Sequence, residues 1–243
     1  MSDKDAATPR VFLIRHGETE WSRNGRYTGN KADIPLLPEG EDKIRQTASI
    51  IFGSGRLIDP SRVSNIICSP RKRATRTLEI LLDSDKASSS KDKLAEKTEV
   101  TEDIGEWGYG DYEGLLTQQI RDLRKSRGLD NQRPWDIWRD GCEGEGGDSP
   151  AQVGERLDRI VKKITTIHGQ ALKEGRRDDV IVVAHGHILR AFVKRWLGFS
   201  VDAPVKLEFM LEPGGVCGLS YSGGDVERRA LLVGMRIPNP DVE

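Results

Sequence analysis

The sequence has 243 residues, and its 38 Lys and Arg residues nearly balance 39 Asp and Glu residues. This length suits one medium-sized domain with its own hydrophobic core, and the balanced charge excludes a global attraction to nucleic acids or acidic membranes. Apolar stretches of about five residues fall short of the roughly 20 that a membrane span needs, and residues 1–8 lack the apolar segment of a secretory signal. The 3 cysteines contain no C-x-x-C pair, so we expect neither a disulfide framework nor a thiolate zinc site. We expect a cytoplasmic location, with access to the nucleus left open.

The N-terminal part of the chain predicts strands that alternate with helices. We expect a disordered tail at 1–8, followed by a buried strand at the apolar run 11–14. Apolar residues at helical spacing predict helices over 39–52 and 71–82. The apolar run 65–68 predicts a second buried strand between these helices.

The middle of the chain is richer in polar residues. The Ser- and Lys-rich stretch 84–97 predicts a mobile insertion, and 115–127 predicts a helix. The glycines in 141–147 exclude regular structure there. At 149–152 the order Ser-Pro-Ala-Gln is typical of a helix start, with serine as N-cap, proline in the first turn and glutamine completing a capping box.

The C-terminal part predicts the centre of the fold. The run 180–184 is apolar throughout, which is typical of a parallel strand covered on both faces, and a helix over 188–197 follows it. A terminal strand pair is expected from 206–211 and 217–221. The alternation of strands with amphipathic helices predicts a single domain over 9–243, an α/β fold built as a three-layer α/β/α sandwich with a mostly parallel central sheet.

Chemically active side chains follow three of the predicted strands. The first strand leads into Arg-His-Gly at 15–17, the second into Arg-Lys-Arg at 71–73, and the central strand into His-Gly-His at 185–187. Three of the chain's 4 histidines therefore lie just past strands. Because ligands of parallel α/β sheets bind outside the carboxyl ends of the strands, we expect these residues to form one pocket.

Arginine and histidine together favour a phosphate site. Guanidinium groups match phosphate oxygens in pairs, a neutral imidazole can attack phosphorus, and a second, protonated imidazole can stabilise the transferred group. A carboxylic acid must then protonate the leaving oxygen. Each element alone has a simpler interpretation: a strand-end histidine capping a helix, or a solvated basic helix start at 71–73. We consider a metal pair at 185 and 187 unfavourable, because no carboxylate or thiolate lies near in sequence.

Four sequence blocks together resemble the histidine phosphatase superfamily, which has the phosphoglycerate mutase-like fold. They are Arg-His-Gly-Glu-Thr at 15–19, the block 69–77 that begins Ser-Pro-Arg, the block 106–114 that ends Tyr-Glu-Gly, and Ala-His-Gly at 184–186. The resemblance implies a nucleophilic His16 that is transiently phosphorylated. It implies that Arg15, Arg73 and His185 hold the phosphoryl oxygens, and that Glu106 protonates the leaving oxygen and then activates water. It implies no metal ion and no other cofactor.

The run 110–143, with its Trp-rich and basic sequence, is similar to the fungal sedoheptulose 1,7-bisphosphatase branch of this superfamily. That similarity implies a metal-independent phosphatase acting on a small sugar bisphosphate, whose second phosphate needs a further basic residue. Ser22 stands where mutases and many phosphatases of the superfamily carry asparagine. The candidate contacts for the rest of the substrate are Ser22, Tyr27, Thr28, Tyr109, Arg133 and Arg139.

Other functions stay open on the sequence. A phosphoglycerate mutase or another small-molecule phosphatase would use the same residues, and a non-enzymatic module could use the pocket only to bind a phosphorylated ligand. By analogy with the superfamily we expect a homodimer to be possible, and we expect no nucleic acid or membrane partner.

Overall fold

The computed structural model describes residues 8–84, 91–205 and 209–233, and these form one mixed sheet with strand order β3-β2-β4-β1-β5-β6. Strands β3, β2, β4 and β1 run parallel, whereas β5 is antiparallel to both of its neighbours. The strand bounds are β1 (Val11–Arg15), β2 (Val63–Cys68), β3 (Thr98–Val100), β4 (Asp179–Ala184), β5 (Val216–Tyr221) and β6 (Arg229–Leu232).

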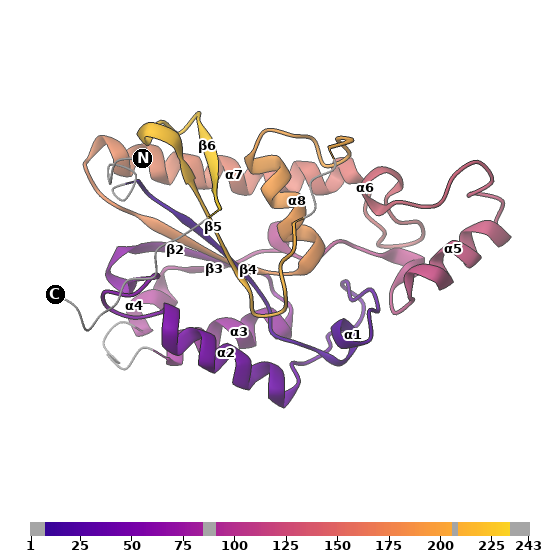
Figure 1. Ribbon diagram of the computed structural model, residues 1–243, viewed down its shortest axis with the longest axis horizontal. Coiled ribbons are helices and arrows are strands. Elements are labelled where there is room, and N and C mark those ends of the chain that lie inside the picture. The colour runs from indigo at the N-terminus through magenta and orange to yellow at the C-terminus, as the bar shows by residue number, and fades with distance from the viewer. Residues whose placement is uncertain (1–7, 85–90, 206–208, 234–243) are drawn as a thin grey trace.

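Helices cover both faces of the sheet, as Figure 1 shows. Along β1, Phe12 and Ile14 belong to the core beneath α2, α3 and α4, whereas Val11 and Leu13 belong to the core beneath α7 and α8. This alternation follows from the pleat of a strand, and it confirms the three-layer α/β/α architecture. The helix bounds are α1 (Glu20–Arg23), α2 (Pro38–Ile51), α3 (Lys72–Asp83), α4 (Lys91–Glu96), α5 (Thr117–Ser126), α6 (Ile137–Asp140), α7 (Pro150–Lys173) and α8 (Gly186–Trp196).

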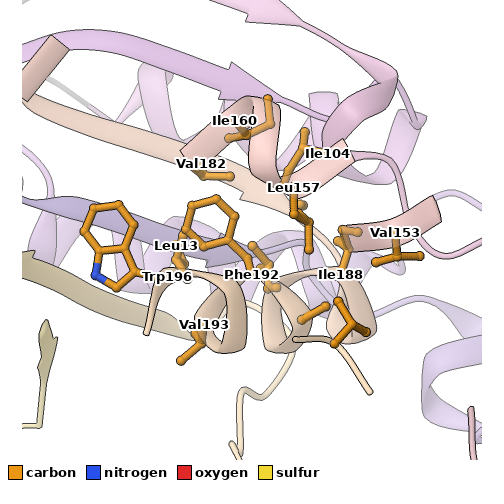
Figure 2. Packing of buried hydrophobic residues seen from close by; sticks show 14 of the residues in the cluster. Leu13, Ile104, Val153, Leu157, Ile160, Val182, Ile188, Phe192, Val193 and Trp196 are labelled. Atoms are coloured by element: carbon orange, nitrogen blue, oxygen red, sulfur yellow. The ribbon is translucent and has the colours of Figure 1, made fainter. Parts of the chain in front are cut away.

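The central strand β4 carries the packing that positions the site. All its residues are buried, and Val182 faces Leu157 of α7 and Phe192 of α8 in the larger core (Figure 2). Strand β4 pairs with β1 on one side, where Ala184 aligns with Arg15, and with β2 on the other. The carboxyl ends of these three parallel strands therefore meet at the same edge of the sheet.

Helices α7 and α8 begin in different ways. The Ser149 hydroxyl accepts a hydrogen bond from the amide of Gln152, and the side-chain oxygen of Gln152 accepts one from the amide of Ser149, so the predicted capping box opens α7. Helix α8 instead begins directly after β4, with His185 at the N-cap position and its side chain free of any capping bond to the backbone. The imidazole of His185 is therefore available for other partners.

Across the described ranges, none of the helices is long and apolar enough to cross a bilayer.

Three expectations need correction. Residues 91–97, expected in a mobile insertion over 84–97, form α4 and a turn, because Leu94 is buried in the core beneath α3; residues 85–90 lie outside the described part. Thr8 is buried rather than part of a tail, and 1–7 lie outside the described part. Strand β5 pairs with β6 instead of with 206–211, of which 209–211 have no strand structure and 206–208 are not described.

Candidate active site

The ends of β1 and β4, the first turn of α3 and the loop after Ile104 supply five side chains, which we call the His16 pocket: Arg15, His16, Arg73, Glu106 and His185. The backbone amide of His16 donates to the carbonyl of Ala184 at 2.9 Å, which ties the end of β1 to the end of β4. The rings of His16 and His185 lie 5.0 Å apart between centroids. The expected convergence of two histidines at this edge is therefore present.

His16 is held in the tautomer that a nucleophile needs. Its Nδ1 lies 2.6 Å from the carbonyl oxygen of Gly17, which only accepts, so Nδ1 carries the proton and Nε2 keeps its lone pair. Burial, reinforced by the charges of Arg73 and Arg15, holds the pKa of His16 well below its usual value, so the ring is neutral. Within the described residues Nε2 has no hydrogen-bond partner. It is also absent from the buried polar atoms that lack a partner, so this nitrogen is not buried.

His185 has the opposite tautomer. Arg73 donates from Nε to Nδ1 of His185 at 3.0 Å, which leaves the proton on Nε2. That Nε2 lies 2.6 Å from the hydroxyl oxygen of Ser69 and donates to it. Burial, with the charge of Arg73 as the second cause, holds the pKa of His185 well below its usual value. The second imidazole was expected to be protonated, but in this structure it is neutral because a guanidinium already fills its acceptor.

The two arginines of the pocket are bound by carbonyl oxygens. Arg73 is fully buried and donates from Nη2 to the carbonyls of Thr28 and Gly29 at 3.0 and 3.1 Å, and Arg15 donates from Nη1 to Leu211 at 2.8 Å. Burial lowers the pKa of each guanidinium, and the Glu106 carboxylate opposes that shift. Nη1 of Arg73 and Nε of Arg15 are buried without a hydrogen-bond partner among the described residues. Unpaired buried donors are rare, so these atoms indicate a site for an anion.

The loop that holds Arg73 is itself held by Glu113. This carboxylate accepts hydrogen bonds from four successive amides, at Gly29, Asn30, Lys31 and Ala32, over 2.9–3.2 Å. The bonds fix the carbonyls of the loop that receive Arg73. Glu113 therefore has a structural role, because it holds the loop whose carbonyls bind Arg73.

Glu106 lies in the loop that precedes Trp107, its carboxylate faces the first amides of α8, and it is 4 % exposed. Its Oε1 accepts from the amides of Trp107 and Ile188, both at 2.9 Å, and its Oε2 accepts from the amide of His187 at 3.2 Å. The positive end of a helix and its free amides stabilise a carboxylate at this position. The arrangement fixes a single carboxyl group beside the two arginines, where it can exchange a proton with a substrate oxygen.

Of the predicted substrate contacts, Tyr27, Tyr109 and Thr28 lie next to the pocket, whereas Ser22 is used in local structure. Tyr27 and Tyr109 lie with their rings 5.0 Å apart beside the pocket, and Thr28 offers its carbonyl to Arg73. The Ser22 hydroxyl is used inside α1, where it accepts from the amide of Thr19 and donates to the Thr19 carbonyl. Tyr109 gives its hydroxyl to His187 at 2.7 Å.

The basic segment 121–139 is largely neutralised by carboxylates. Arg139 binds both oxygens of Asp140 at 2.9 and 2.7 Å, and Arg133 lies 3.8 Å from the same carboxylate. Arg124 is buried and pairs with Asp130 at 2.8 Å. The structure does not record a contact between Arg133 or Arg139 and the five residues of the His16 pocket.

Three further residues border the pocket: the sequence predicted His187 there without giving it a role, and it singled out neither Ser69 nor Arg190. Ser69 accepts from His185, and His187 lies against Tyr27 and Tyr109. Burial lowers the pKa of Arg15, and the nearby charge of Arg190 adds to this shift. Arg190 also donates from Nε to the carbonyl of Gly186 at 3.0 Å. The signal for Arg190 was its spacing from His187, because residues at positions i and i+3 of a helix lie on the same face.

No group of three His, Cys, Asp or Glu side chains in the described ranges is arranged to hold a metal ion. Both ring nitrogens of His185 are engaged, one by Arg73 and one by Ser69. The donors of the pocket are cationic or neutral N–H groups, which suit an anionic ligand.

Comparisons with known proteins agree with this geometry. Residues 11–232 match the model of the histidine phosphatase superfamily (branch 1). The chain is 39% identical to sedoheptulose 1,7-bisphosphatase of Saccharomyces cerevisiae over 97% of this chain and 96% of that protein. It is 34% identical to an acid phosphatase of Mycobacterium tuberculosis over 87% of each chain. A solved structure of a Mycobacterium tuberculosis open reading frame matches with a TM-score of 0.67 and 30% identity, covering 93% of this chain and 96% of that one.

Proposed function

Because this chain belongs to the histidine phosphatase superfamily, we propose that it is a metal-independent phosphatase that releases phosphate from a sugar bisphosphate through a phosphohistidine intermediate. The similarity to a sedoheptulose 1,7-bisphosphatase supports sedoheptulose 1,7-bisphosphate as the first substrate to test. The observation that carries the proposal is the neutral His16, whose free Nε2 adjoins two arginines with unpaired buried donors.

In the first step, Nε2 of His16 attacks phosphorus and the bond from phosphorus to the sugar oxygen breaks. Arg15 and Arg73 have donors in place for the phosphoryl oxygens, and the Nε2–H of His185 can turn from Ser69 to a third oxygen. Glu106 gives a proton to the departing sugar oxygen, which leaves as an alcohol. The bond from Nδ1 of His16 to Gly17 supports the positive charge that the ring acquires.

In the second step, the Glu106 carboxylate takes a proton from water, and the resulting hydroxide attacks phosphorus. The bond from phosphorus to Nε2 breaks, inorganic phosphate leaves, and His16 returns to its neutral state. Glu106 is then protonated again and ready for another substrate. One carboxyl group serves both steps because its backbone bonds keep it at the same place.

We propose Arg190 as the residue that binds the second phosphate. Burial raises the pKa of Tyr27, and the nearby charges of Arg190 and Arg121 oppose this shift, so both arginines lie near the Tyr27 ring. Within the described part of the chain, neither Arg190 nor Arg121 forms an ion pair with a carboxylate, whereas Arg139 does. A cation without a carboxylate partner binds a phosphate at a lower cost, because no existing pair has to be broken.

The experiment is a phosphate-release assay with sugar bisphosphates, including sedoheptulose 1,7-bisphosphate, run with and without EDTA. We expect release that resists chelation, and a His16→Ala variant whose kcat falls by at least about 10³-fold. Acid-labile, base-stable phosphate on the quenched wild-type protein would support the phosphohistidine. A chain inactive on all sugar bisphosphates, or inactivated by EDTA, contradicts the proposal. Isomerisation of 3-phosphoglycerate without release of phosphate would identify a mutase instead.

A further inference from the structure

His187 lies beside the His16 pocket and has no role in the reaction described above. Its half-buried ring is stacked against Tyr27, with centroids 5.4 Å apart and planes 17° apart. Tyr109 and Trp138 enclose other sides of the ring at 5.8 and 5.7 Å. Three aromatic neighbours therefore fix both the position and the plane of this imidazole.

The bond to Tyr109 also fixes which nitrogen of His187 carries the proton. Tyr109 is buried, and within the described residues its hydroxyl has one partner, Nδ1 of His187 at 2.7 Å. A buried hydroxyl proton needs an acceptor, so Tyr109 donates and Nδ1 accepts. The proton of the neutral ring then lies on Nε2. Burial, followed by the charges of Arg190 and Arg15, holds the pKa of His187 well below its usual value, so the ring is neutral.

The Nε2–H donor is open to a ligand. Within the described part of the chain this atom has no hydrogen-bond partner, and it is absent from the buried polar atoms that lack one. The backbone amide of the same residue binds Oε2 of Glu106, the group that protonates the leaving oxygen. His187 therefore adjoins the carboxylate that is proposed to protonate the leaving oxygen.

We propose that His187 is a substrate-binding residue that donates a hydrogen bond from Nε2 to an oxygen of the sugar, and that Tyr109 is the positioning residue that fixes this donor. The inference rests on the proposed sugar-phosphatase reaction. A site built to donate to a substrate oxygen discriminates strongly against analogues that lack this oxygen. His187 should therefore favour sugar phosphates over phosphate esters without hydroxyl groups.

The test compares two substrates across three variants. The substrates are sedoheptulose 1,7-bisphosphate and p-nitrophenyl phosphate, an aryl ester that lacks sugar oxygens. Asparagine at position 187 offers an amide near Nδ1 but none near Nε2, whereas glutamine offers one near Nε2. We expect His187→Asn to lose about 10–100-fold in kcat/KM on the sugar substrate and less than about threefold on the aryl ester. His187→Gln should recover part of that loss, and Tyr109→Phe should show a smaller loss with the same selectivity.

Tyr221→Phe is the matched control. Tyr221 bonds Nδ1 of His168 at 2.9 Å in a pair of the same kind, within the core beneath α7. This variant should leave the ratio of the two kcat/KM values unchanged. Equal losses on both substrates for His187→Asn, or no recovery with His187→Gln, would overturn the inference. Failure of the proposed function is seen separately, as a wild-type chain that does not hydrolyse the sugar substrate, and that result would overturn the role of His187 as well.

Discussion

The His16 pocket and the basic segment 121–139 both concentrate arginine, but they use it differently. In the pocket, Arg15 and Arg73 bind backbone carbonyl oxygens and keep further buried donors unpaired. In the segment, Arg124 and Arg139 bind carboxylates. A carbonyl oxygen orients a guanidinium without neutralising its charge, whereas a carboxylate both orients the guanidinium and neutralises its charge. An anion site is therefore located by how cations are paired, and not by how many of them the sequence contains.

Substitution in the pocket should produce the largest effect. Arg73→Lys keeps the positive charge but loses the fork that reaches the two loop carbonyls and the ligand. We expect kcat/KM to fall by about 10²–10³-fold. The far-UV circular dichroism spectrum of the ligand-free protein should stay near that of the wild type. Steady-state kinetics on a sugar bisphosphate measure this. Activity within about threefold of wild type would show that charge alone is sufficient in the pocket.

Substitution in the basic segment should affect stability instead. Arg124→Met leaves Asp130, whose side chain is 9 % exposed, without its arginine partner and removes a bond to the Tyr112 hydroxyl. We expect the free energy of unfolding to fall by about 3 kcal/mol, with kcat of the folded protein changed less than about threefold. Urea denaturation and kinetics below the transition measure the two quantities. A large loss of kcat with unchanged stability would place Arg124 in the catalytic machinery.

A buried base outside both regions gives a pH-dependent reference. Burial lowers the pKa of His168 from 6.5 to about 4, because its ring is enclosed by the core. As the pH falls below 6.5, His168 binds a proton in the unfolded chain but not in the folded chain. The free energy of unfolding therefore decreases with falling pH, down to about pH 4. We expect His168→Gln to remove about 2 kcal/mol of the stability difference between pH 7 and pH 5. Urea denaturation at both pH values tests this, and an unchanged pH dependence would contradict it.

The smallest effects should separate two candidates for the second phosphate. Arg190→Gln should raise KM for a sugar bisphosphate about tenfold, whereas Arg139→Gln should change KM less than about twofold, because Arg139 is already paired with Asp140. A sugar monophosphate serves as the control, since it lacks the second anion and both variants should then behave alike. If Arg139→Gln raised KM more than Arg190→Gln did, the second phosphate would bind to the basic segment instead.

Much of the fold and the pocket could be predicted from short-range patterns. The apolar run of β4, the capping box of α7 and the residues at strand ends each depend on a few neighbouring residues, and the structure has them at the expected places. The pairing of β5 with β6 was missed because Arg229–Leu232 is short and half-buried. Leu94 was missed because a single buried residue in a polar stretch carries no periodicity.

The contacts that build the pocket could not be predicted, because they join residues far apart in the sequence. The four amides bound by Glu113 lie more than 80 positions away from it, and Arg73 meets His185 across a separation of 112. Arg139 pairs with the next residue, Asp140, but the sequence does not show which of the charged neighbours in this segment an arginine binds. Sequence patterns identified the arginines, and the folded chain decided which of them keep their charge available.

The bond between the His16 ring and the carbonyl of Gly17 has an evolutionary consequence. Many catalytic histidines depend on a distant acidic residue to select their tautomer, so loss of that residue disables the base. Here two consecutive residues perform the selection. The tautomer of the proposed nucleophile is consequently fixed locally, so the surrounding loops can change without disturbing the nitrogen that is proposed to attack.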